Sequence, residues 1–369
     1  MSSLVVTTDP DDLRHILKEQ FVDYPKGPIF RGVFGDLLGR GIFNADGEEW
    51  ILQRKRASRF FTQNNMRGHM TRVFESDASE LVRRWTSTSR IVDVQAEFQR
   101  VILLAFLQVA FNLSAKDLSF DVDEFSRSFD EAQRISSKRF LNPFWKVLRY
   151  FQLLSERELT HHVGVVRSCV KSMLASSKDS DRSHLLYHMS KSSGSADLEE
   201  MAINLLVAGR DTTSNTLTSC VRCLALYPTS QSAIYHDLQV HLFNTGGRVD
   251  WEDIMSSCHY LRGFIREVHR LYPPVHSDIK HASTDDVLPS GVRVHKGENI
   301  LYSIWSVGRC PRWGADSEVF DPTRWARRNT LDVFSYPIFN AGYRTCLGKR
   351  MAELETTIFV SKIVAHLQI

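Results

Sequence analysis

The sequence predicts a protein that is mainly α-helical with a small β-sheet. Most segments of the 369-residue chain repeat apolar residues at helical spacing, and only a few short segments alternate as strands do. With 43% apolar and 24% charged residues, the composition is ordinary for a globular protein that buries a large core. No linker rich in glycine or proline interrupts the chain, so we expect a single domain spanning residues 1–369.

The helices expected from periodicity follow one another along almost the whole chain. They span residues 10–19, 48–61, 67–86, 92–113, 121–136, 155–176, 197–226, 230–243, 258–271 and 349–367. Strands are expected at residues 4–7, 281–282, 292–295 and 299–302. Residues 176–195, rich in Ser, Lys and Asp, predict an exposed loop.

The expected helix at 197–226 is the longest. Asp197 can act as its N-cap and Glu200 stands three residues later, as in a capping box. Because the helix lacks a heptad pattern, we expect it to lie at the centre of the fold. The apolar run 101–113 contains Gln108 and Asn112 and is too short for a bilayer, so it predicts a buried helix.

Charge and cysteine content exclude several function classes. The net charge of +3 gives no global reason to expect a nucleic-acid partner. The six cysteines are scattered, unlike a disulfide scaffold. Cys220 and Cys223 form a C-x-x-C inside a helical pattern with no second pair nearby, which favours buried thiols over a zinc site.

The segment from Phe339 to Gly348, with the sequence FNAGYRTCLG, is the sharpest signal in the chain. Gly342 allows a turn with positive φ, and Gly348 lets the backbone approach a flat macrocycle closely. Cys346 precedes a predicted helix, whose N-terminal dipole favours a thiolate. Arg344 can donate charge-assisted hydrogen bonds to a carboxylate.

This segment resembles the cysteine-loop signature F-x-x-G-x-R-x-C-x-G of the cytochrome P450 family, with each fixed position matched. The resemblance implies that fold, with haem b between the long central helix and the cysteine loop. Cys346 would ligate the iron, and Phe339, Gly342, Arg344 and Gly348 would contact the haem. The fourteen histidines show no ligand spacing, which disfavours a histidine-ligated haem.

Ala208-Gly209-Arg210-Asp211-Thr212-Thr213 resembles the oxygen-activation segment of the same family. Ala208 and Gly209 leave room for a diatomic ligand. The Thr212 hydroxyl can bond the Ala208 carbonyl and open the helix locally. Asp211 and Thr212 are expected to be catalytic and to deliver protons to bound dioxygen.

Two further motifs imply a buried ion cluster. Glu267-Val268-His269-Arg270 resembles the E-x-x-R helix of the family, and Pro322-Thr323-Arg324-Trp325 resembles the segment that adds a second arginine. Residues i and i+3 of a helix share a face, so Glu267 and Arg270 can pair. The expected cluster of Glu267, Arg270 and Arg324 would lock the loop around Cys346.

Haem propionates would have three further contacts by resemblance. Trp50 and Arg54 match the W-x-x-x-R motif on a predicted helix, and Lys280 follows a proline turn where relatives carry a basic residue. Electrons are expected from NADPH–cytochrome P450 reductase, because the chain has no flavin or dinucleotide fingerprint. Basic residues that suit an acidic reductase occur at residues 54–56, at Arg59 and at residues 349–350.

Longer segments resemble the fatty-acid ω-hydroxylase branch of the family. They cover residues 23–27, 37–43, 46–47, 142–146 and 303–314. The resemblance implies a haem-thiolate monooxygenase that uses O2 to hydroxylate an aliphatic C–H bond, in a long-chain fatty acid near the ω end. A monomer on the cytosolic face of the endoplasmic reticulum is implied, with peripheral membrane contact.

Compared with the family pattern, the chain is expected to lack an N-terminal anchor, the first strand and a C-terminal β-hairpin. Two alternatives therefore stand beside an active monooxygenase. One is a catalytically impaired haem-binding fragment. The other is a haem-thiolate enzyme that rearranges peroxides without electron input; relatives of that kind usually lack the acid–alcohol pair, so Asp211 and Thr212 argue against it.

Overall fold

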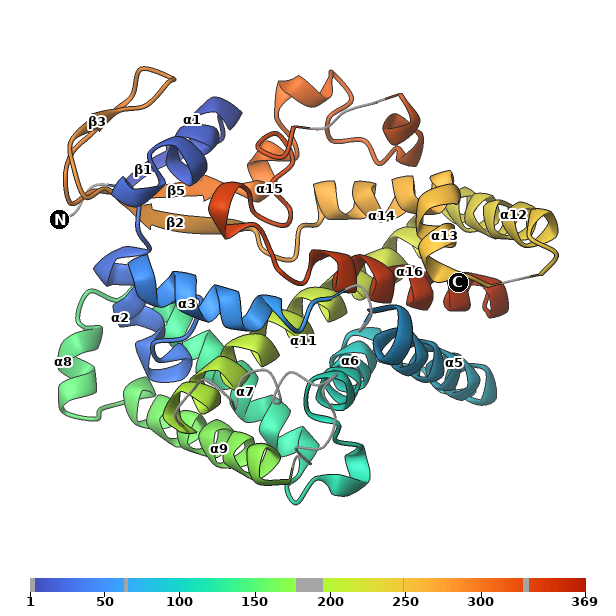
Figure 1. The fold of residues 1–369 in the computed structure, drawn as a ribbon, viewed down its shortest axis with the longest axis horizontal. Helices are drawn as coiled ribbons and strands as arrows, with labels where there is room; N and C mark the ends of the chain where they lie inside the picture. Colours follow the sequence, from blue (N-terminus) through green and yellow to red (C-terminus); the bar gives the residue numbers. More distant parts are fainter. Residues whose placement is uncertain (1–3, 63–65, 177–194, 248, 328–331) are drawn as a thin grey trace. The chain divides into compact units, whose positions relative to one another are not determined.

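A computed structural model describes residues 4–62, 66–176, 195–247, 249–327 and 332–369 (Figure 1). The expected loop at 176–195 lies almost entirely outside these residues. The described chain divides into two compact units. The first unit contains residues 1–24, 63–102 and 209–369, and the second contains residues 25–62 and 103–208. The expectation of a single domain stays a prediction.

The first unit contains both small sheets. β1 (Leu4–Thr7) pairs in parallel with β5 (Asn299–Ser303), which pairs antiparallel with β2 (Ser277–His281). Two short strands, β3 (Asp286–Val287) and β4 (Arg293–Val294), form a separate hairpin. The strands expected at 4–7 and 299–302 are confirmed. The strand expected at 281–282 ends at His281 and begins four residues earlier.

Helices build the rest of the first unit. The N-terminal segment continues from α1 (Pro10–Arg14) into the π-helical turn η1 (His15–Glu19) and the 3-10 turn η2 (Phe21–Asp23). α16 (Lys349–His366) packs against α5, α12, α13 and α14. The other elements of this unit are η3 (Met66–Met70), α5 (Thr71–Ser87), α12 (Pro228–Asn244), α13 (Trp251–Ser257), α14 (His259–Leu271), α15 (Ile304–Val307), η5 (Pro311–Trp313), η6 (Pro322–Ala326) and η7 (Gly342–Arg344).

The second unit is helical. α7 (Val122–Lys138) packs against α9 (Ser155–Ser176) and against α2 (Gly27–Leu38), and α8 (Trp145–Tyr150) packs against α9. α7 and α9 lie side by side in Figure 1. The unit also contains α3 (Gly47–Ser58) and the 3-10 turn η4 (Ala115–Asp117).

Two long helices contribute to both units. α11 (Ser195–Leu226) is the longest described helix with 32 residues, and it begins two residues before the expected N-cap, Asp197. α6 (Val94–Phe111) is apolar and long enough to cross a membrane by length and composition, yet 56% of it is buried in the protein. A buried helix at this place was expected from the sequence and is confirmed.

Four α-helices were not expected: α2, α8, α13 and the four-residue α15. α2 has Gly27 at its start and two more glycines in its sequence, which weaken the helical pattern. α8 and α13 have six and seven residues, too few for a periodic signal. Tertiary packing therefore decides these helices rather than local propensity.

The core of the first unit connects the N-terminal segment to the sheet and to the segment before Cys346. It contains fully buried Leu13, Ile16 and Leu17 from the N-terminal helix, with Ile300 and Tyr302 from β5. Ile338 and Ala341 belong to the same cluster, and Phe339 packs against it. The N-terminal end of the cysteine loop is thus anchored in the apolar core of this unit.

Candidate active site

The cysteine loop is held by main-chain hydrogen bonds. The Cys346 amide donates to the Phe339 carbonyl at 2.8 Å, and the Thr345 hydroxyl donates to the Gly342 carbonyl at 2.7 Å. Asn340 has a left-handed conformation, with φ of 58°, and its side-chain oxygen accepts from the Ala341 amide at 2.8 Å. An asparagine tolerates this conformation better than most residues because its short polar side chain bonds the local backbone.

Gly342 is the residue that lets this loop pack closely. Its φ is 62°, so the positive-φ turn expected from the sequence is confirmed. A Cβ atom added here would lie 2.0 Å from the Leu17 carbonyl oxygen and 2.6 Å from the Leu17 carbonyl carbon. Both groups belong to backbone and cannot rotate away, so only glycine fits against the N-terminal segment.

Cys346 differs from the other cysteines in its exposure. It is exposed, whereas Cys169, Cys220, Cys223 and Cys258 are buried. Burial raises the pKa of Cys223 and of Cys258 to about 12, and it also raises the pKa of Cys169 and Cys220. These four thiols stay protonated at neutral pH and are poor metal ligands. All six cysteines lie within the described residues, and none forms a disulfide.

Two of the residues expected to contact haem propionates meet at one aromatic ring. Lys280 is fully buried on β2, and its Nζ lies 5.8 Å from the centre of the Phe21 ring. The Arg344 guanidinium carbon lies 5.9 Å from the same ring centre. Two neighbouring cations in a poorly solvated place favour the binding of a carboxylate. A thiol at Cys346 and cations in the same unit are the donor set that a haem needs.

Glu267 lies at the centre of a buried ion cluster. Arg270 donates to it through Nη2 at 2.7 Å and Nε at 2.9 Å, and Arg324 Nε lies at 3.4 Å. The Trp325 indole and the Asp321 amide also donate to Glu267, each at 2.9 Å. The structure thus brings together the three residues expected to cluster.

Arg324 has its closer carboxylate partner elsewhere. Two of its nitrogens contact the two oxygens of Asp316 at 3.0 Å, and its Nη1 donates to the Trp313 carbonyl at 3.0 Å. Arg270 donates in addition to the Gly308 carbonyl at 2.6 Å and the Val319 carbonyl at 3.1 Å. Arg270 on α14 thus bonds residues 308–319, and Arg324 joins the same residues to Glu267 of α14. Together they hold α14 against this segment, which precedes the cysteine loop.

The expected oxygen-activation segment lies in the middle of α11. Asp211 and Thr212 are half-buried, and buried Arg210 contacts Asp211 Oδ1 through Nη1 at 3.1 Å. The Thr212 carbonyl accepts from the Thr216 hydroxyl at 2.9 Å. The bond expected from the Thr212 hydroxyl to Ala208 stays a prediction.

Trp50 and Arg54 lie on α3 in the second unit. The Trp50 side chain is buried, and the Arg54 guanidinium carbon lies 5.6 Å from its ring centre. Among the neighbouring basic residues, Lys55 and Arg59 are exposed, whereas Arg56 is only 15% exposed and lies 3.9 Å from Asp197. Lys349 and Arg350 of the first unit are exposed.

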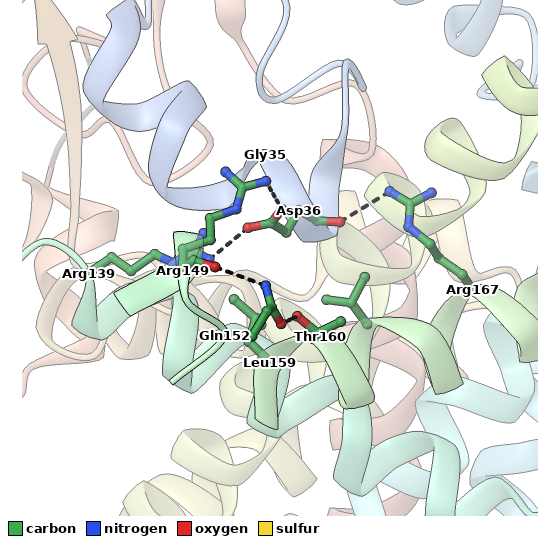
Figure 2. A pocket seen from close by; sticks show the side chains of 9 residues that line it. Gly35, Asp36, Arg139, Arg149, Gln152, Leu159, Thr160 and Arg167 are labelled. Atoms are coloured by element: carbon green, nitrogen blue, oxygen red, sulfur yellow. Dashed lines mark hydrogen bonds and ion pairs between the residues drawn. The ribbon is translucent and has the colours of Figure 1, made fainter. Parts of the chain in front are cut away.

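A cavity of about 450 Å³ lies in the second unit, among α2, the α7–α8 segment and α9 (Figure 2). Asp36 contacts Arg139 at 2.7 Å and Arg149 at 2.5 Å, and its carbonyl accepts from Arg167 at 3.1 Å. Arg139 also pairs with buried Glu156 at 2.5 Å. Carboxylates therefore balance the arginines, and no residue expected to bind the cofactor lines this cavity.

Comparison with known proteins shows the family. The family model described as Cytochrome P450 matches residues 1–369. Cytochrome P450 94A1 of Vicia sativa is 32% identical over 393 residues, which cover 99% of this chain and 76% of the relative. Cytochrome P450 94C1 of Arabidopsis thaliana is 32% identical over 391 residues, with 99% and 78% covered. The Cytochrome P450 monooxygenase cyp1 of Mycosarcoma maydis is 31% identical over 399 residues, with 99% and 62% covered. The chain therefore belongs to the cytochrome P450 family, whose members are haem-dependent oxidoreductases that incorporate molecular oxygen.

Proposed function

We propose that this chain hydroxylates an aliphatic C–H bond of a long-chain fatty acid near its ω end, using O2 and electrons that NADPH supplies through cytochrome P450 reductase. The observation that carries the proposal is the presentation of Cys346, the exposed thiol of a loop braced by Gly342. The segments at residues 23–27, 37–43 and 303–314, which resemble fatty-acid ω-hydroxylases, support the substrate class.

Cys346 would hold haem b through its sulfur. When bound, the haem supplies the oxygen chemistry, and a thiolate ligand donates electron density that favours O–O cleavage. The Phe339 carbonyl fixes the Cys346 amide, so the sulfur is presented from a loop of defined conformation. Gly348 caps α16 directly after this loop, and the helix dipole there stabilises an anionic sulfur.

The cationic side chains would anchor the haem propionates. Arg344 and Lys280 lie next to Phe21 in the first unit, and Trp50 and Arg54 lie on one helix of the second unit. Charge-assisted hydrogen bonds from the three cations, together with a neutral hydrogen bond from the Trp50 indole, would hold the propionate side chains. The buried ion cluster of Glu267, Arg270 and Arg324 would act indirectly, because it keeps the segment before the cysteine loop in place.

Asp211 and Thr212 would deliver protons toward dioxygen. Asp211 is 22% exposed through its side chain, so it can exchange protons with water. Buried Arg210 contacts Asp211 Oδ1 through Nη1 at 3.1 Å, which orients the carboxylate. Thr212 follows directly in the helix and can pass a proton from its hydroxyl.

An exposed apolar segment of the second unit supports peripheral membrane contact. Leu141, Phe144, Tyr150 and Leu154 are 70–87% exposed around the short helix α8. Lys146 on the same helix is exposed as well, and Arg149 is exposed while it pairs with Asp36. Apolar side chains flanked by basic ones suit the interface of an anionic membrane such as the cytosolic face of the endoplasmic reticulum.

The test is turnover of saturated C12 to C18 fatty acids with NADPH and a purified reductase, followed by mass spectrometry of the products. We expect ω or ω-1 hydroxy acids that form only when the reductase is present. Thr212→Val and Asp211→Asn should lower the hydroxylation rate by about 100-fold, in the range of general acid–base contributions. The matched control is Thr218→Val, which removes a similar hydroxyl on the same helix.

Two outcomes would contradict the proposal. Peroxide turnover of equal rate with and without reductase would indicate a rearranging enzyme. Absence of product from each acid, in protein that binds haem through sulfur, would instead indicate another substrate class or a catalytically impaired haem-binding protein.

A further inference from the structure

His269 lies between two structural features that the proposed function needs. It is a buried residue of α14, two positions after Glu267 and directly before Arg270. Its Nε2 lies 3.2 Å from the Thr216 hydroxyl of α11. On another side, its ring meets the Phe339 ring edge-to-face, with 5.6 Å between centres and an interplanar angle of 81°.

The hydrogen-bond direction follows from the acceptors. The Thr216 hydroxyl lies 2.9 Å from the Thr212 carbonyl, which can only accept, so the Thr216 hydrogen points there. The Thr216 oxygen is then the acceptor for His269, and the imidazole carries its proton on Nε2. Burial lowers the pKa of His269 to about 4, which keeps this ring neutral at physiological pH.

On its other side the imidazole reaches the cysteine loop. Phe339 is the first residue of that loop, and its carbonyl accepts from the Cys346 amide at 2.8 Å. A single side chain therefore contacts the turn of α11 that carries Thr212 and the residue that fixes the Cys346 amide. These contacts all lie within the first unit.

We propose that His269 is a positioning residue that couples the Thr212 turn of α11 to the loop of Cys346. The role of this coupling in oxygen chemistry rests on the proposed function, whereas the physical link between the two segments does not. A neutral imidazole suits the task because it is at once a directional donor and a flat ring with a polarised edge. An aliphatic side chain of similar size offers neither property.

The two contacts can be removed separately. His269→Phe keeps a ring against Phe339 and removes the donor to Thr216. His269→Gln keeps a donor and removes the ring. Thr216→Val removes the acceptor from the other side. Thr218→Val is its matched control, because the Thr218 hydroxyl also donates one turn back along α11, to the Ser214 carbonyl at 2.8 Å, whereas His269 pairs with Thr216.

The first readout is amide hydrogen exchange in the chain without haem. His269→Gln should speed exchange at residues 339–346 by about two- to tenfold, the range of one aromatic pair. His269→Phe and Thr216→Val should speed exchange around residues 212–216 and leave the loop near the wild-type rate. Thr218→Val should change neither the loop nor these amides. Equal behaviour of Thr216→Val and Thr218→Val, or an unchanged loop in His269→Gln, would overturn the proposal.

The second readout is the yield of hydroxylated product per NADPH consumed in the haem-loaded enzyme. His269→Phe and Thr216→Val should each lower this yield several-fold, and their combination should lower it no further, because both break one link. Additive losses would contradict the coupling. If wild-type protein forms no product, the proposed function fails, while the exchange measurement still decides whether His269 joins the two segments.

Discussion

Glu267→Gln tests the buried cluster, because it removes one negative charge and leaves the shape of the side chain. Glu267 and Arg270 are both fully buried, and they form a bidentate pair at 2.7 and 2.9 Å. A neutral amide leaves Arg270 charged in the core, with only main-chain carbonyls as further acceptors in the described contacts. Breaking a buried pair in this way costs about 3–5 kcal/mol.

Asp316→Asn is the matched control at the same cluster. Asp316 contacts Arg324 at 3.0 Å, closer than the 3.4 Å between Arg324 and Glu267, so distance alone would rank Asp316 as the stronger partner of Arg324. Its side chain, however, is 51% exposed, and water can replace it. Burial therefore predicts a large loss of stability at Glu267 and a small loss at Asp316.

Thermal unfolding followed by circular dichroism measures the difference. An unfolding entropy of about 2.1 cal/mol/K per residue gives about 0.8 kcal/mol/K for the 369-residue chain. A loss of about 3–5 kcal/mol then lowers the midpoint by about 4–6 °C in Glu267→Gln. A midpoint shift in Asp316→Asn that equals or exceeds this one would refute the argument that burial governs the cluster.

Three further predictions follow from the first unit. Gly342→Ala should lose more stability and more haem than Gly297→Ala. Both positions have positive φ, but only Gly342 would place a Cβ atom 2.0 Å from a backbone oxygen. Equal losses in the two variants would contradict the close-packing argument. Lys280→Met should speed the loss of haem to an acceptor protein by several-fold, whereas Lys296→Met at an exposed position should not; equal rates would remove Lys280 from the haem contacts. Burial raises the pKa of Asp77 from 3.8 to about 6. The folded chain therefore binds this proton more tightly than the unfolded chain, and the free energy of unfolding falls as the pH rises from about 4 to about 6. Asp77→Asn should therefore raise the urea midpoint at pH 7 and leave it unchanged below pH 4, and a larger gain at pH 4 than at pH 7 would show the opposite sign.

Local sequence signals predicted several features of both units correctly. A positive φ was expected at Gly342 because a glycine allows the turn that the loop before Cys346 needs, and its φ of 62° confirms this. α9 was predicted with its observed bounds, since its periodicity extends over six turns. Glu267 and Arg270 share a helix face by spacing alone, so their pairing needed no tertiary information.

Contacts between distant segments could not be predicted in the same way. Asp316 is the closer partner of Arg324, and Trp325 donates to Glu267, yet neither residue has a spacing that indicates it. Phe21 lies beside Lys280 and Arg344 only because the N-terminal segment packs against the sheet and the cysteine loop. His269, between Glu267 and Arg270, could have been singled out from the sequence, because a histidine on a buried helix face needs a hydrogen-bond partner.

The account depends most directly on a thiolate at Cys346 as the ligand of the iron. The reduced carbon-monoxide difference spectrum of purified wild-type protein and of Cys346→Ser measures this ligation. We predict a thiolate-type Soret band in the wild-type protein and its loss in Cys346→Ser. The same band in both proteins, or a histidine-type band in the wild type, would contradict the assignment of Cys346.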